Sequence, residues 1–153
     1  MSGIIDSLYT IKYNPFKFGE HLASFYSSLN KVDNNLLLAP LVIPLCGHPA
    51  FRDKLGNAVF GKNRKSTIFS VFDDRAKLHD LQERLDGFKR ITEQSIQFCL
   101  VNDWLTLDVE NLMLRQENKT DFNMHHQKHS INLAKLFSNH SLTEIYSFFG
   151  VKP

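Results

Sequence analysis

The segment that most restricts the fold of this chain is Thr92–Leu114, where an apolar-periodic stretch leads directly into two short runs of strand-forming residues. The runs are Trp104–Leu107 and Leu112–Leu114, and the polar residues Asp108–Glu110 separate them. Two short apolar runs with a polar break of this length predict a tight β-hairpin. A helix followed by such a hairpin is typical of the recognition helix and wing of a winged-helix unit. This order favours a binding or architectural protein over an enzyme.

The N-terminal half predicts helices. Asn14 and Pro15 suit the N-cap and first position of a helix that buries one apolar face. The apolar run 36–45 contains Pro40 and Pro44, so we expect a kinked helix or two short pieces in the core. A short helix follows His48 and extends to about residue 55.

Helix ends in the second half are predicted from capping residues. We expect Ser66 to cap a short helix that extends to Val71, and Asp73 or Asp74 to cap a longer one. That longer helix is expected to end at Asp86-Gly87, because glycine suits the left-handed position after a helix. A separate helix over 92–102 then precedes the hairpin. Near the C-terminus, Ser141 and Glu144 have the spacing of a reciprocal capping box.

The chain is therefore predicted to form one mainly α-helical domain over 1–153, with a winged-helix-like helix and a short β-hairpin. Its expected parts are an N-terminal arm (1–13), the helix and wing (92–114), an exposed linker (117–129) and a C-terminal helical pair (130–153). A chain of 153 residues is long enough to bury a core without disulfides or metals.

We infer the cellular compartment from sequence features that the chain does not contain. No apolar run approaches the roughly 20 residues of a membrane span, and the first residues contain neither the basic region nor the A-x-A-like cleavage site of a signal peptide. The two cysteines, Cys46 and Cys99, are expected to be reduced thiols. We expect a cytoplasmic protein without membrane contact.

Motifs for catalysis are incomplete. Residues 56–63 nearly match a P-loop, but Asn63 stands where a hydroxyl is needed for magnesium, and the preceding residues predict a helix instead of a strand. The sequence contains no G-x-S-x-G elbow and no glycine-rich dinucleotide turn. Without an assembled nucleophile and base, we expect no catalytic residues, no enzymatic activity and no cofactor.

Three histidines, His125, His126 and His129, have a spacing that a helix could present to a metal. Zinc sites usually need four ligands with cysteine or carboxylate support. The surrounding segment is polar and lacks a clear period, so we interpret it as the exposed linker and expect no metal.

The charge distribution points to one basic loop. Residues 61–91 contain eight Lys and Arg against five Asp and Glu, whereas residues 92–153 contain five against seven. Lys62, Arg64 and Lys65, here called the basic loop, are the candidate nucleic-acid contacts, or contacts to an acidic partner surface. The alternative is a solvated surface loop.

Aromatic residues are the candidate partner contacts. Trp104, the single tryptophan, falls where the predicted helix meets the hairpin, and tryptophan is enriched at interface hot spots. Tyr13, Phe16, Phe148 and Phe149 lie near the termini and are further candidates. For each of the five, the alternative is core packing.

Four segments, in this order, carry a resemblance to a known family: NPFKFGEHLASFYSSLN (14–30), LLLAPLVIPLCGHPAFRDKL (36–55), TEQSIQFCLVNDWLTLD (92–108) and INLAKLFSNHSLTEIYSFFGVKP (131–153). Together they resemble the middle component of bacterial three-component ABC ATPase systems, among which are the Lamassu-type defence operons. The positions that match are scaffold residues: Asn14, Pro15, His48, Gly150 and Pro153. The loop 56–65 fits loosely and the segment 117–129 has no counterpart.

The resemblance implies a small, non-enzymatic, mostly helical subunit of an anti-phage or anti-plasmid defence complex. Its expected partners are an SMC- or Rad50-like ABC ATPase and an effector such as a nuclease, with DNA reached through the complex. The alternative from the residues is a stand-alone winged-helix DNA-binding regulator. Such a regulator needs basic residues on helix 92–102 and the wing, yet the helix has none and the wing offers only Arg115.

Overall fold

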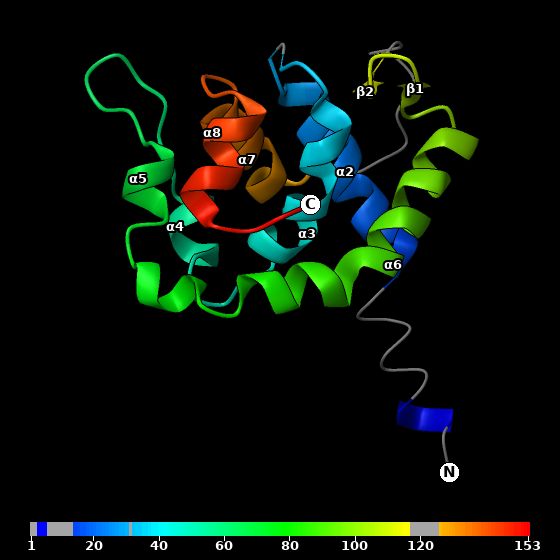
Figure 1. Ribbon diagram of the computed structural model, residues 1–153, viewed down its shortest axis with the longest axis horizontal. Coiled ribbons are helices and arrows are strands. Elements are labelled where there is room, and N and C mark those ends of the chain that lie inside the picture. Colours follow the sequence, from blue (N-terminus) through cyan, green and yellow to red (C-terminus); the bar gives the residue numbers. More distant parts are fainter. Residues whose placement is uncertain (1–2, 6–13, 31, 117–125) are drawn as a thin grey trace.

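Helix α2 (Pro15–Ser28) lies at the centre of the fold and packs against both α6 (Leu81–Val101) and α7 (Lys128–Phe137). The computed structural model describes residues 3–5, 14–30, 32–116 and 126–153 (Figure 1). The start of α2 is as predicted, because the Asn14 side chain accepts a hydrogen bond from the Phe16 amide at 2.8 Å and Pro15 follows the cap. Tyr13 lies outside the described residues.

The apolar run after α2 forms two pieces, which confirms that prediction. A 3₁₀ turn, η1 (Asn35–Leu38), continues into α3 (Ala39–Cys46). Pro40 falls in the first turn of α3, where a missing backbone donor costs nothing, and Pro44 lies inside the helix. Every residue of α3 apart from Pro40 is buried, so this segment is core on all sides.

Three short elements follow: α4 (Arg52–Gly56), α5 (Ile68–Val71) and the 3₁₀ turn η2 (Arg75–Leu78). The predicted cap of α5 is wrong by one residue. Thr67 caps it, exchanging hydrogen bonds with Ser70, while Ser66 accepts from the Val59 amide. A capping box needs its partner three residues on, and only Thr67 has one that can donate back.

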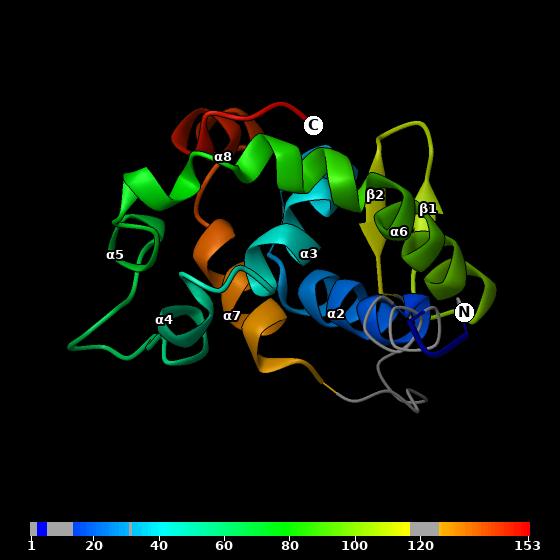
Figure 2. The same ribbon diagram turned by 90° about the horizontal axis from the view of Figure 1, so that it is seen from below.

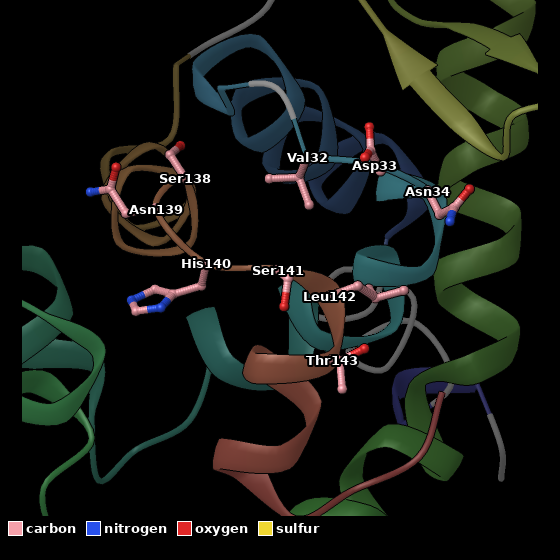
Figure 3. A pocket seen from close by; sticks show the side chains of 9 residues that line it. All are labelled: Val32, Asp33, Asn34, Ser138, Asn139, His140, Ser141, Leu142 and Thr143. Atoms are coloured by element: carbon pink, nitrogen blue, oxygen red, sulfur yellow. The ribbon is translucent and has the colours of Figure 1, made fainter.

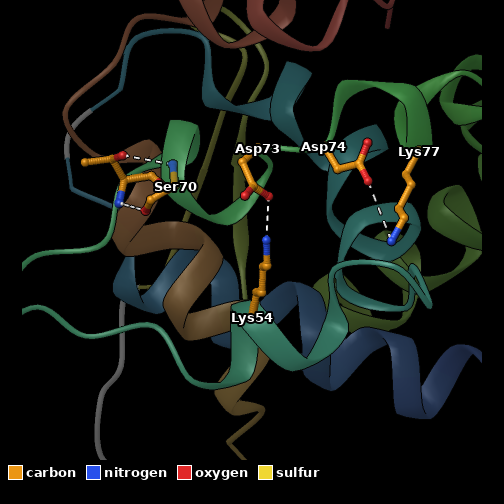
Figure 4. A network of polar contacts seen from close by, with 6 residues as sticks. Lys54, Ser70, Asp73, Asp74 and Lys77 are labelled. Atoms are coloured by element: carbon orange, nitrogen blue, oxygen red, sulfur yellow. Dashed lines mark hydrogen bonds and ion pairs between the residues drawn. The ribbon is translucent and has the colours of Figure 1, made fainter.

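The two aspartates predicted to cap the next helix make ion pairs instead (Figure 4). The Asp73 carboxylate accepts from Lys54 Nζ of α4, and the Asp74 carboxylate lies 3.7 Å from Lys77 Nζ. The hydrogen bond from Lys54 lowers the pKa of Asp73 below its usual value. Asp74 precedes η2 but makes no side-chain capping bond.

The expected helix end at Asp86-Gly87 is wrong. Helix α6 continues through Gly87 for 21 residues, so the predicted pair of helices is one. Figures 1 and 2 show that α6 begins after η2, near the middle of the long axis, and extends to the hairpin end with a change of direction on the way. The Ser95 hydroxyl donates to the Ile91 carbonyl one turn earlier, at 2.6 Å, a contact that bends helices.

The predicted hairpin is present directly after α6. Strands β1 (Thr106–Asp108) and β2 (Met113–Arg115) pair antiparallel, with Leu107 opposite Leu114. A mainly helical fold with one small hairpin is thus confirmed, and its relation to winged-helix units stays a prediction. Asp103, with a φ of 58°, turns the chain out of α6.

The C-terminal pair consists of α7 and α8 (Leu142–Phe149). Ser141 caps α8 by accepting from the Glu144 amide at 3.2 Å, as predicted, but the Glu144 carboxylate pairs with His140 at 3.1 Å instead of returning to the cap. Helix α7 begins at Lys128, so the last residues of the predicted linker 117–129 are helical. Within the part of the chain that the structure describes, no helix combines the length and apolar character of a membrane span.

Candidate functional site

Two of the predicted partner residues, Phe16 and Trp104, lie on the same aromatic cluster. Phe98 of α6 connects them, with its ring centroid 4.5 Å from that of Phe16 and 5.2 Å from that of Trp104, both edge to face. Phe16 is 59% exposed, and Val101, one turn beyond Phe98, is 73% exposed. We call these four residues the aromatic end. Such an exposed cluster is the kind of surface that proteins use to bind other proteins.

The turn of the chain at the end of α6 brings the residues of the aromatic end together. The amide of Trp104 donates to the Cys99 carbonyl at 2.9 Å, which folds the chain back so that the indole meets Phe98. The Cys99 thiol is within 3.2 Å of the Gly19 carbonyl, and Gly19 leaves room for the Phe98 ring. Burial raises the pKa of the Cys99 thiol to about 12, so this cysteine is an un-ionised core group.

A second exposed aromatic surface lies on α5 and α8. The ring of Phe69, 61% exposed, packs edge to face on that of Phe148 at 5.1 Å. The Arg75 guanidinium lies 5.1 Å from the centre of the Phe148 ring and donates to the Phe148 carbonyl at 2.8 Å. We call Phe69, Arg75 and Phe148 the α5–α8 surface.

Phe149 differs from its neighbour. It is 4% exposed and packs on Phe72 and Phe137, so it belongs to the core, as the alternative interpretation held. Partner binding by Phe16, Trp104 and Phe148 stays a prediction.

The basic loop lies between α4 and α5. A bridge between Phe60 and Lys65 closes it, and the Ser66 hydroxyl accepts from the Val59 amide at 3.0 Å. Lys62, Arg64 and Lys65 are all exposed. In Figure 1 this loop projects at the α5 end, at the opposite end of the long axis from β1 and β2.

The P-loop-like motif has no phosphate-binding geometry. Gly56 ends a helix, not a strand, and His129 of α7 packs against it: a Cβ at Gly56 would lie 2.8 Å from His129 Nε2. Burial lowers the pKa of His129. His125 lies outside the described residues, and among the rest no three His, Cys, Asp or Glu side chains are placed to hold a metal.

A hollow of about 500 Å³ lies where the turn after α2 meets the α7–α8 connection, and Figure 3 shows its lining. Val32, Asp33 and Asn34 form one side and Ser138–Thr143 the other. The His140 ring points away from Ser141 and Thr143 and is held by Glu144. The Ser141 hydroxyl caps α8. These polar groups thus serve the helix ends, and the hollow brings together no nucleophile and base.

One serine–histidine contact was missed by the sequence analysis. His21 Nδ1 lies 2.7 Å from the Ser130 hydroxyl, which in turn lies 3.4 Å from Cys46 Sγ. Ser130 and Cys46 are buried, and burial raises the pKa of Cys46 to about 12. Burial also lowers the pKa of His21 to about 4, with a further contribution from Lys17. The group therefore joins α2, α3 and α7 as a neutral polar contact within the core.

Phe98 and Phe69 were also not foreseen. Their pattern was available in the sequence: Phe98 and Val101 are three residues apart, and residues at that spacing share a helix face. Cys99 lies on the buried face of α6, whereas Val101 lies on its exposed face.

Comparison with known proteins gives one match. The family model of the ABC-three component (ABC-3C) system Middle Component 3 matches residues 2–153. No curated protein and no solved structure matches the chain.

Proposed function

Because the chain belongs to the Middle Component 3 family of ABC-three component systems, we propose that it is a non-catalytic subunit that bridges the other components of such a system. The partners that fit are an SMC- or Rad50-like ABC ATPase and an effector such as a nuclease, working in defence against phage or plasmids. The family match supports a middle component and does not extend to the Lamassu type, which stays a prediction.

The observation that carries the proposal is the separation of two exposed aromatic surfaces. The C-terminal end of α6, which carries the aromatic end, and α5 lie toward opposite ends of the long axis, and α8 lies between them, nearer to α5 (Figures 1 and 2). Helix α6 lies between them, and 21 helical residues have a length of about 30 Å along the helix axis. A helical domain with two separate aromatic contact surfaces suits a subunit that holds two proteins at once.

The same geometry argues against a stand-alone regulator. The C-terminal third of α6 carries no basic residue, and Arg115 on β2 lies 3.8 Å from the Asp108 carboxylate. A guanidinium paired within its own hairpin is a weak phosphate ligand, and recognition helices need several such contacts. We therefore assign the hairpin end to protein contacts.

Co-purification with single-end variants tests the bridge. The tagged chain is co-expressed with the ATPase and effector encoded beside it. Val101→Glu at the aromatic end should release one partner and keep the other, while Phe69→Glu on the α5–α8 surface should do the reverse. A buried charge at an interface costs several kcal/mol, so the loss should be at least about tenfold.

Matched controls place the same charge on exposed polar positions close to each surface. Gln94→Glu on α6 and Asn63→Glu in the basic loop should keep both partners. If both aromatic variants released the same partner, the two-ended bridge would be wrong. If the wild-type chain purified alone and bound duplex DNA with a steep salt dependence, the regulator would be favoured instead.

A further inference from the structure

The two outer edges of the β1–β2 hairpin differ in their hydrogen bonding. Asn35 of η1 covers the outer edge of β2: its Nδ2 donates to the Leu114 carbonyl at 3.1 Å, and its Oδ1 accepts from the Leu114 amide at 2.7 Å. The Leu36 amide donates to the Leu112 carbonyl at 2.9 Å. The outer edge of β2 is thus satisfied by side-chain and backbone groups of the same chain.

This pairing shows which way the backbone of β1 faces. Since both backbone groups of Leu114 point toward Asn35, Leu114 and its opposite residue Leu107 form a non-hydrogen-bonded pair. In such a pair the N–H and C=O of Leu107 must also point away from the sheet. Among the described residues none bonds to these two groups, so β1 has an open edge.

The side chains along this edge form an apolar stripe that leads out of the core. Leu105, Leu107 and Val109, at alternating positions, are 2%, 39% and 70% exposed. Short exposed strand edges are usually protected by charge or covered by another segment. Here exposed leucine and valine side chains flank the open edge, which suits an added strand that buries them.

The net charge of the residues around the β1 edge indicates which charge a segment that binds there should carry. Residues 103–116 contain three carboxylates, on Asp103, Asp108 and Glu110, and one guanidinium, a net charge of −2. Hydrogen bonds from Asn111 lower the pKa of Asp108, which therefore stays ionised near neutral pH. A second copy of the chain would bring like charges together, whereas a segment with basic residues would be attracted.

We propose that the open edge of β1 accepts an extended segment of a partner subunit that carries apolar side chains on one face and Lys or Arg beside them. The segment would exchange two backbone hydrogen bonds with Leu107 and cover Leu107 and Val109, as in β-strand addition to a sheet edge. This inference rests on the proposed bridging function and assigns to the hairpin the contact with one of the two partners.

Amide hydrogen exchange at residue resolution tests the edge directly. The full chain is measured alone and after saturation with the purified ATPase or effector subunit. The Leu107 amide should exchange rapidly in the free chain, and one of the two subunits should slow it by about tenfold or more, because the amide gains an acceptor away from water. The Leu114 amide, already bonded to Asn35, is the internal reference.

A proline variant separates backbone pairing from side-chain contact. Leu107→Pro removes the outward N–H together with the leucine side chain, and an edge strand tolerates proline at such a position; it should weaken binding of that subunit by about tenfold or more. Leu107→Ala keeps the N–H and should lose less binding affinity than Leu107→Pro. The circular dichroism spectra of both variants should match that of the wild type. Slowed exchange and this order of affinities would support the inference.

Four results would overturn it, and they differ in what else they affect. If a complex formed while the Leu107 amide stayed unprotected, or if Leu107→Pro bound like Leu107→Ala, the edge would be wrong and the bridge would stand. Protection that appeared when the chain alone was concentrated would identify a second copy as the occupant. If neither subunit bound the wild-type chain, the proposed function itself would fail together with the inference.

Discussion

Single side chains decide whether the hairpin is held to the helices, and Asn35 is the main one. It is 6% exposed, and its amide satisfies both backbone groups of the buried Leu114. Asn35→Ala should lower the free energy of unfolding by about 2–4 kcal/mol, because two buried backbone groups lose their partners. Chemical denaturation measures this. Asn139→Ala, at an exposed asparagine, should change it by less than about 0.5 kcal/mol. Equal losses would mean that Asn35 does not hold β2.

The partly buried ring of His21 makes stability depend on pH. Its pKa is lowered from 6.5 to about 4, chiefly by burial and then by Lys17. Between these values the unfolded chain binds a proton that the folded chain does not. The free energy of unfolding should therefore fall as the pH decreases through this window, by on the order of 3 kcal/mol at its lower end. Above pH 6.5 the ring contributes no pH dependence.

Substitution of His21 isolates its share of this pH dependence. His21→Asn keeps a polar group near Ser130 without a titrating ring and should flatten the pH profile, measured by denaturation between pH 4 and 7. Burial also lowers the pKa values of His48 and His129, so a smaller slope should remain. His79→Asn, the same substitution at an exposed histidine, is the matched control. A profile unchanged by His21→Asn would show that the ring is not buried neutral.

At the residue scale, the contacts that the sequence predicted are those between residues close together in the chain. Asn14 and Ser141 were identified as caps because a cap and the amide it binds lie within three residues of each other. The role of Asn35 was not predicted, because its partner Leu114 lies 79 positions away and no local pattern connects the two residues. The contact between His21 and Ser130, which lie 109 positions apart, could not be predicted from the sequence for the same reason.

The longest element, α6, shows where a local rule fails. Glycine after aspartate predicted a helix end at residue 87, yet the buried positions Leu81, Leu85, Thr92 and Cys99 continue one face across it. Packing of that face against α2 and α3 outweighs the roughly 1 kcal/mol that a glycine costs inside a helix. The hairpin was predicted correctly because its turn and strands are adjacent in sequence.

A glycine pair tests the continuity of α6. A Cβ at Gly87 would meet no atom within 4 Å, so Gly87→Ala should raise the free energy of unfolding by about 0.5–1 kcal/mol. Gly150, with a φ of 66°, ends α8 in the left-handed region. Gly150→Ala should therefore lower the free energy of unfolding by about 1 kcal/mol. If both variants lost stability, Gly87 would be a helix end and α6 would be two helices.

At the scale of the whole molecule, two chemically different surfaces are kept apart. The hairpin end carries net negative charge and apolar residues, while the loop between α4 and α5 carries Lys62, Arg64 and Lys65. The order of segments in the sequence suggested that the basic residues precede the hairpin, but not that the two would lie at opposite ends of the long axis (Figure 1). Contact with DNA, if made through this subunit, would therefore occur at the α5 end, away from the strand edge.

Charge reversal of the basic loop tests this arrangement in the assembled complex. Lys62→Glu, Arg64→Glu and Lys65→Glu together should leave assembly intact and weaken binding of duplex DNA, because three phosphate contacts are lost. The slope of log affinity against log salt concentration should become shallower by about 3, as each contact releases a counterion. The control reverses three exposed basic residues elsewhere with the same change in net charge: Lys89, Arg90 and Lys128. Equal effects of the two triple variants would indicate that net charge alone acts, whereas an unchanged slope in both would show that the basic loop is only solvated.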